Sequence, residues 1–248
     1  IEQPVCITGP TGVGKTASSR AFSMMRPCRS KDPFGFQFHS FHSTTKVSHF
    51  FGTTVISDGN IQFHDGTLTT ALKKGIIFIA DEFNLSTQPV MKSLALALDP
   101  TVGRKVYIPG TGQMIKISPE FFFIACQNEL GTLGRNAIPE SILQRFVEID
   151  YPKPKLDEIK NICVEIAKDN FPQKSLEKFK DTKLAEGIAN FMIKLNELKL
   201  IDIPPWSLRD ITKLFKRIYN EKNNRKFIGL TSIHHILFYT LSAVPPNN

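Results

Sequence analysis

The chain has 248 residues, of which 41% are hydrophobic and 22% charged, a composition that excludes a disordered or fibrous protein. Its longest unbroken apolar runs are far shorter than the roughly 20 residues needed to cross a bilayer, so no membrane span and no membrane partner are expected. Four scattered cysteines, none in a CxxC pair, exclude a zinc ribbon. They predict buried thiols in a reducing intracellular compartment, cytoplasm or nucleus.

The net charge of +8 is unevenly distributed. Residues 1–150 carry 14 basic and 12 acidic groups, whereas residues 151–248 carry 17 and 11. A basic second half fits a nucleic-acid or acidic-protein partner, but it also fits lysines on solvated helix faces. The lack of a basic block with interleaved aromatic residues favours solvated lysines, so direct nucleic-acid binding stays open.

The first half of the chain alternates short apolar runs with helix-like segments. Residues 4–8 form an apolar run that ends in a glycine-rich turn, and Lys15–Met25 can then be helical. Two further runs, Gly75–Ala80 and Glu120–Cys126, flank a helix-like stretch at Thr87–Leu98. Apolar strands alternating with helices predict an α/β fold, with a parallel sheet covered by helices on both faces.

Two glycine-punctuated segments interrupt this alternation. Thr53–Phe63 has β-branched residues around Asp58-Gly59, and Arg104–Ile117 alternates apolar and polar residues around a Pro-Gly-Thr-Gly turn. Both patterns predict β-hairpins inserted into the core. Working protrusions and plain surface loops are equally open interpretations.

A change of pattern at Tyr151-Pro152-Lys153-Pro154 predicts a domain boundary, because the prolines break regular structure and the following chain has helical periodicity. We expect an α/β core domain at 1–152 and a small all-α domain at 153–248. The predicted helices of the second domain are Leu156–Asn170, Lys183–Lys199, Ser207–Asn220 and Thr231–Ser242. Ser207 and Asp210 resemble the start of a helix with a capping box.

The glycine-rich turn fits the P-loop pattern GxxxxGK[ST] in its expected context, after a strand and before a helix. Its residues are Gly9-Pro10-Thr11-Gly12-Val13-Gly14-Lys15-Thr16. Glycines let backbone N–H groups surround phosphate oxygens, and the helix N-terminus contributes its positive dipole end. Lys15 would meet the β- and γ-phosphates and Thr16 would hold Mg²⁺, so the motif predicts a nucleoside triphosphate site.

Polar residues at the ends of two later strands complete this site. Asp81 and Glu82 follow the run Gly75–Ala80, which places Asp81 to reach Mg²⁺ and Glu82 to activate the attacking water. Asn128 follows the run ending at Cys126 and could position that water. Arg145 and Arg209 are candidates for stabilising transition-state charge, although the residues alone favour a surface ion pair for each of them.

The ordered motifs resemble those of AAA+ ATPases, in the dynein-related branch typified by midasin, with MoxR-type ATPases and dynein as relatives. Members of this branch have a DGxL passage, a DE[LIF]NLA motif, a hairpin ending in IP and an ATQNP-like strand tip. The matching segments here are Asp65-Gly66-Thr67-Leu68, Asp81-Glu82-Phe83-Asn84-Leu85-Ser86, Ile108-Pro109 and Ala125-Cys126-Gln127-Asn128.

That resemblance implies a role for each candidate. Asn128 would be the sensor-1 residue, and Arg145 the arginine finger that reaches a neighbouring module's nucleotide. Arg209 would be the sensor-2 arginine of a helical lid, acting in cis or in trans. The two hairpins would be inserts that face the pore or a client.

We therefore expect Mg²⁺-dependent ATP hydrolysis that drives remodelling of a protein or ribonucleoprotein client within a hexamer-like ring of AAA+ modules. The start at Ile1, without an initiator methionine, indicates a piece of a longer protein and favours tandem modules over copies of one chain. Two alternatives stay open. One is a structural module that binds nucleotide without hydrolysing it, and the other is a GTP-using motor of the same branch.

Overall fold

The computed structural model describes residues 3–26, 35–57, 59–99, 105–111, 113–129, 136–170, 187, 190, 193 and 207–214. The chain divides into two compact units, Ile1–Pro152 and Lys153–Asn248. The division falls within the proline-containing segment at which the sequence changes pattern. Within the described ranges, no helix is both long and apolar enough to cross a membrane.

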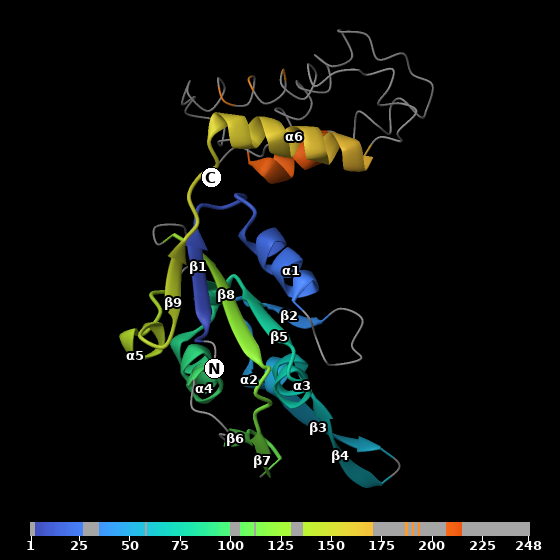
Figure 1. Cartoon of the computed structure of the whole chain (residues 1–248). Coiled ribbons are helices and arrows are strands. Elements are labelled where there is room, and N and C mark those ends of the chain that lie inside the picture. The colour runs from blue at the N-terminus through green and yellow to red at the C-terminus, as the bar shows by residue number, and fades with distance from the viewer. Residues whose placement is uncertain are drawn as a thin grey trace. The chain divides into compact units, whose positions relative to one another are not determined.

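Five parallel strands form the centre of the first unit, in the order β2-β5-β8-β1-β9 (Figure 1). They are β2 (Phe36–Ser40), β5 (Ile77–Asp81), β8 (Phe122–Asn128), β1 (Val5–Gly9) and β9 (Val147–Asp150). The register pairs Gly9 with Asn128 and Ala80 with Ala125. The carboxyl ends of β1, β5 and β8 therefore lie together at one end of the sheet, where open α/β folds bind ligands.

Helices cover both faces of the sheet, as the alternating pattern predicts. One face receives α1 (Lys15–Met25), with the Phe22 ring 6.3 Å from the Phe122 ring. The other face packs against four helices, whose core residues include Phe50, Leu72 and Met91. These helices are α2 (Val47–Phe51), α3 (Thr67–Lys74), α4 (Gln88–Leu98) and α5 (Glu140–Leu143). β5 and β8 are buried between the two layers, which explains their continuous apolar sequences.

Both predicted hairpins are present as separate antiparallel pairs. They are β3 (Gly52–Ser57) with β4 (Asn60–Asp65), and β6 (Lys105–Ile108) with β7 (Gln113–Lys116). Figure 1 shows both projecting from the end of the first unit at which β1 begins, away from its P-loop end. The Thr54 hydroxyl donates to the carbonyl of Gly110 at 3.4 Å, so β3 contacts the turn between β6 and β7.

The described part of the second unit is helical. It contains α6 (Leu156–Asn170) and a helical segment at 208–214, with Cys163 and Ile211 buried. Ser207 donates to the Asp210 carboxylate from its backbone N–H at 3.0 Å and from its hydroxyl at 2.7 Å, as the capping pattern predicts. Of the predicted helix at 183–199 only residues 187, 190 and 193 are described, all of them helical. The predicted helix at 231–242 lies outside the described residues.

Candidate functional site

The P-loop connects the carboxyl end of β1 to the first turn of α1. Gly12 and Gly14 have φ angles of 78° and 105°, which side chains disfavour. No side chain caps the start of α1, and its first turn contains no acidic residue. A Cβ placed at Gly14 would meet no atom within 4 Å. The open space and the exposed helix N-terminus fit a phosphate group.

Lys15 is 6% exposed and points back over the loop. Its ammonium group donates to the carbonyls of Gly9 at 2.8 Å and Pro10 at 2.6 Å, and to Asn128 Oδ1 at 2.6 Å. The three bonds use the three donors of an ammonium group. Lys15 therefore joins the P-loop to the tip of β8.

Thr16 and Asp81 meet at the end of β5, where the Thr16 hydroxyl donates to Asp81 Oδ1 at 2.7 Å. Both side chains offer oxygen ligands, which Mg²⁺ prefers, and Mg²⁺ is usually held by one or two protein groups together with water and substrate phosphates. The pair fits Mg²⁺ in that manner. Among the described residues, no group of three or more His, Cys, Asp or Glu is placed to hold a metal ion by itself.

Glu82 follows β5 directly and has a φ angle of 53°, the one positive φ among the described non-glycine residues. Such a conformation costs energy and persists where the surroundings enforce it. Asn128 Nδ2 donates to both carboxylate oxygens of Glu82 at 3.0 Å. Since Asn128 also accepts from Lys15, one amide connects the P-loop cation to the carboxylate predicted to activate water.

Asn84 supports this arrangement, although the sequence predicts no role for it. It is fully buried in the short 3-10 helix η1 (Phe83–Leu85), and its Nδ2 donates to the backbone carbonyl of Asn128 at 2.8 Å. Asn136 extends the support, because its backbone N–H donates to the Asn84 carbonyl at 2.8 Å. The one available signal for Asn84 is a polar residue within an otherwise buried apolar turn after Asp81 and Glu82.

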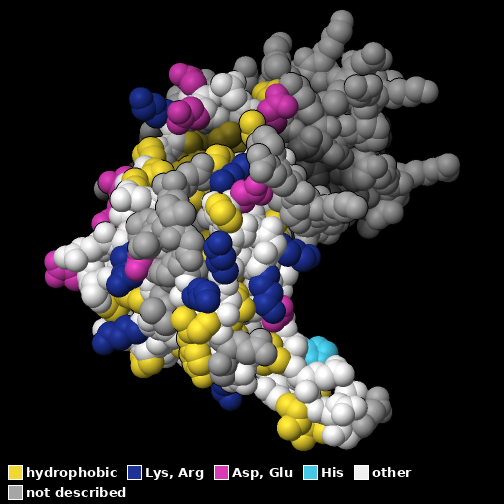
Figure 2. Space-filling view, turned by 60° about the horizontal axis from the view of Figure 1, so that its bottom comes forward, with side chains coloured by type: hydrophobic (Ala, Val, Ile, Leu, Met, Phe, Trp, Pro, Cys, Tyr) yellow, Lys and Arg dark blue, Asp and Glu magenta, His cyan; other side chains and the backbone are white. Residues whose placement is uncertain are grey.

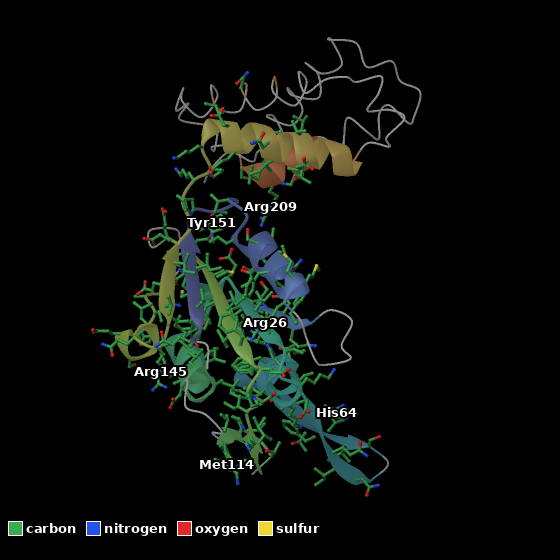
Figure 3. All side chains as sticks on the ribbon, in the orientation of Figure 1. Arg26, His64, Met114, Arg145, Tyr151 and Arg209 are labelled. Atoms are coloured by element: carbon green, nitrogen blue, oxygen red, sulfur yellow. The ribbon has the colours of Figure 1, made fainter. Side chains whose placement is uncertain are left out.

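Tyr151 is a second residue with no predicted role in the site. Its backbone N–H donates to the backbone carbonyl of Thr8 at 2.6 Å, and its hydroxyl lies 2.7 Å from the hydroxyl of Ser18 on α1. A Cβ at Gly9 would lie 2.2 Å from the Tyr151 carbonyl oxygen, so the chain after β9 packs directly on the P-loop. Figure 3 shows Tyr151 at the end of β9, near the start of α1.

Cys126, on β8 beside the site, is buried and forms a contact of 3.2 Å with the Ser19 hydroxyl. Burial raises the pKa of its thiol to about 11, although the hydrogen bond with Ser19 opposes the rise. The thiol is therefore neutral at physiological pH and is unsuited to act as a nucleophile.

Of the two arginine candidates, Arg145 lies apart from this cluster, and Arg209 belongs to the second unit. Arg145 donates to the carbonyl of Ala95 at 2.9 Å and to that of Ser141 at 3.2 Å. It precedes β9 and so lies at the opposite end of the sheet from Tyr151 (Figure 3). Arg209 is exposed on the helical segment 208–214 of the second unit. The structure brings together Lys15, Thr16, Asp81, Glu82 and Asn128, and does not bring Arg145 to them.

Comparison with known proteins places this geometry in a family. Residues 4–146 match the AAA domain of the dynein-related subfamily. Midasin from Dictyostelium discoideum is 30% identical over 163 residues, which cover 64% of this chain and 3% of midasin. NorQ from Paracoccus denitrificans is 28% identical over 157 residues, covering 61% of this chain and 54% of NorQ. The chain thus spans a small fraction of the midasin relatives and about half of NorQ.

A solved structure shares the fold. A provisionally assigned ATPase of Cytophaga hutchinsonii superposes with a TM-score of 0.53 at 17% identity, covering 95% of this chain and 76% of that chain. At this identity the likeness concerns the fold alone. The family match extends over more than half of the chain, from β1 to the residue before β9. The chain belongs to the dynein-related subfamily of AAA domains and is a midasin-like AAA+ module.

Proposed function

We propose that this module binds ATP with Mg²⁺ and hydrolyses it, and that hydrolysis drives remodelling of a macromolecular client within a ring of AAA+ modules. The observation that carries the proposal is the contact sequence from Lys15 through Asn128 to Glu82, beside the Thr16–Asp81 pair. A module that only holds nucleotide needs the P-loop and an Mg²⁺ ligand. It does not need a carboxylate held beside the P-loop cation.

Each residue has a distinct part in the proposed reaction. When bound, the nucleotide would supply the γ-phosphoryl group and Mg²⁺ would offset its negative charge. With nucleotide bound, the loop N–H groups would hold phosphate oxygens, Lys15 would exchange a bond to one of its present partners for a bond to a phosphate oxygen, and Thr16 and Asp81 would hold Mg²⁺ through oxygen. Glu82 accepts a proton from the attacking water, and Asn128 holds the Glu82 carboxylate in position.

Phosphate release by the purified protein, compared with Glu82→Gln, tests hydrolysis. Both proteins should bind labelled ATP, and the variant should turn it over at least about 100-fold more slowly, because general-base catalysis contributes that much. Binding by both with turnover by neither, under conditions in which the modules assemble, would support the structural-module alternative. Competition of bound ATP by GTP decides between the ATPase and the GTP-using motor.

The ring and its client belong to the same proposal. Arg145 cannot serve its own P-loop from the opposite end of the sheet, so a role at a nucleotide requires a neighbouring module. Copies of this chain or tandem modules on one polypeptide would supply that neighbour. A protein or ribonucleoprotein client, handled in the cytoplasm or nucleus, fits the proposed activity.

A further inference from the structure

The β6–β7 hairpin has two unlike faces. Its inner face contributes Val106 and Ile108, each 1% exposed, to the core. Its outer face carries four exposed side chains in two cross-strand pairs. These pairs are Lys105 with Lys116, and Tyr107 with Met114. Because side chains alternate along a strand and directly opposed residues share a face, all four point the same way.

The lysine pair destabilises the hairpin. Directly opposed residues have Cβ atoms about 5 Å apart, and like charges at that separation destabilise a hairpin. Residues 104–118 contain no Asp or Glu that could offset the pair. With the described residues, neither lysine forms an ion pair. An anion placed between the two ammonium groups would remove the repulsion.

The neighbouring pair, Tyr107 and Met114, is also exposed, although both side chains are large and largely apolar. Tyr107 is 46% exposed and Met114 is 55% exposed. They lie two residues from the lysines, about 7 Å along the hairpin. A flat aromatic ring beside paired cations is the arrangement with which proteins hold a single polynucleotide strand, since bases stack on the ring and phosphates meet the cations.

We infer that this outer face binds a single-stranded polynucleotide, with a phosphodiester at Lys105 and Lys116 and a base stacked on Tyr107. RNA and DNA share both features. The inference deepens the proposed remodelling function by naming the chemistry of the client. The sequence showed no basic block with interleaved aromatic residues, because this cluster forms only when the register of β6 and β7 brings the residues together.

A polypeptide fits the same face less well. A polypeptide backbone brings no charge to the space between Lys105 and Lys116, whereas every phosphodiester of a polynucleotide carries one negative charge. Figure 2 shows Lys and Arg side chains gathered on the side of the molecule turned forward, with few Asp and Glu side chains among them.

Fluorescence anisotropy with labelled RNA and DNA single strands of about 15 nucleotides tests the inference on the whole chain. Lys105→Gln/Lys116→Gln should weaken binding about tenfold or more at low salt. It should also reduce the slope of log affinity against log salt by about 1.4, which is 0.7 for each lost contact. Lys46→Gln/Lys92→Gln removes the same charge from exposed sites on the first unit and should leave the slope unchanged.

Two variants of Tyr107 test the aromatic contact. Tyr107→Phe keeps the ring and should bind nearly as wild type, while Tyr107→Ala should lose at least about fivefold. Equal losses in the lysine pair and its control, or no loss in Tyr107→Ala, would overturn the inference. Preferential binding of polyglutamate over both oligonucleotides would overturn it too. Thermal unfolding of each variant checks that it is folded. If Tyr107→Ala proves to be unfolded, the result for the lysine variants decides the question.

ATP binding, measured on the same samples, separates the two proposals. ATP bound without any oligonucleotide leaves the proposed function standing and rejects the polynucleotide face. Oligonucleotide bound without ATP does the reverse.

Discussion

Asn84 shows how the site depends on side chains that position other residues. Its amide donates to the backbone of Asn128 from a fully buried place, while the side chain of Asn128 lies between Lys15 and Glu82. The backbone of Asn128 is thus fixed from one side and its amide is used on the other. A small displacement of Asn128 would misplace the Glu82 carboxylate.

Asn84→Ala should lower the turnover of bound ATP about tenfold or more, because small misplacements of reacting groups are costly. ATP affinity should change little, since the P-loop is untouched. The free energy of unfolding should fall by about 1–3 kcal/mol for the donor lost to a buried carbonyl. Ser93→Ala, which removes a hydroxyl bonded to a carbonyl on α4, is the control for stability alone. Turnover at the wild-type rate in Asn84→Ala would make Asn84 purely structural.

Gly9 lies at the contact between the P-loop and the chain that follows β9. Gly9→Ala would place a Cβ 2.2 Å from the Tyr151 carbonyl oxygen, so the backbone must move. We expect the free energy of unfolding, measured in urea, to fall by about 3 kcal/mol, and ATP binding to weaken. Gly59→Ala is the matched control, since a Cβ there meets no atom within 4 Å and only its φ of 76° is strained. Its cost should be about 1 kcal/mol, and equal costs would contradict the proposed contact.

The residues proposed to bind phosphate and metal could be predicted, because each lies at or just after the end of a strand and has a chemical type that the proposed reaction needs. Lys15, Thr16, Asp81, Glu82 and Asn128 converge as that reasoning requires. Asn84 and Tyr151 could not be predicted in the same way. Their contributions are contacts to backbone atoms distant in sequence, and no local pattern encodes such contacts.

At the scale of elements, the two strands that the sequence pattern does not predict lie at the edges of the sheet. β2 and β9 each have one neighbour, whereas β5, β8 and β1 each have two. Continuous apolar runs are typical of strands buried on both faces, and neither edge strand has one. Phe36–Ser40 and Val147–Asp150 alternate apolar and polar residues, and neither strand is buried: all of β9 and the last residue of β2 are exposed. The short helices α2, α3 and α5 offered too few turns for a clear periodicity.

The edge strand β2 carries a histidine that makes stability depend on pH. Burial lowers the pKa of His39 from 6.5, and His49 and His42 lower it further. As the pH falls below about 6.5, the unfolded chain binds a proton that the folded chain takes up only at a lower pH. The stability that depends on neutral His39 is therefore present above that pH and is lost on acidification.

Urea unfolding at pH 7 and pH 5.5 should show a smaller loss of stability for His39→Phe than for wild type. Phenylalanine keeps an aromatic ring against Phe41 and Phe50, whose centroids lie 4.7 and 5.7 Å from that of His39. His64→Gln changes an exposed histidine on β4 and serves as the control. Identical acid sensitivity in wild type and His39→Phe would show that His39 does not carry the effect.

At the scale of the whole molecule, the proposed nucleotide site lies at one end of the sheet, and Arg145 and the hairpins lie at the other. The P-loop, Asp81 and Asn128 lie at the carboxyl ends of the strands, while Arg145 and both hairpins lie toward the other end (Figures 1 and 3). One module alone therefore does not bring Arg145 to its own P-loop. Head-to-tail association, in which one surface of a module meets a different surface of the next, would complete the site.

A mixing experiment tests that association. Arg145→Ala and Lys15→Ala should each be inactive alone, the first for lack of a donated arginine and the second for lack of a P-loop cation. Mixed in equal amounts, they should regain roughly a quarter of the wild-type rate, because one interface in four joins an intact P-loop to an intact Arg145. Co-assembly without any recovery of phosphate release would contradict a donated arginine.

The central claim is that Asn128 and Glu82 act as one unit at the nucleotide, and a double-mutant cycle of single-turnover phosphate release tests it most directly. Asn128→Ala and Glu82→Gln should each lower the rate about 100-fold. The double variant should be no slower than the slower single variant, since groups that act together are non-additive. Rates that fall multiplicatively in the double variant, or a Glu82→Gln rate equal to wild type, would contradict the account.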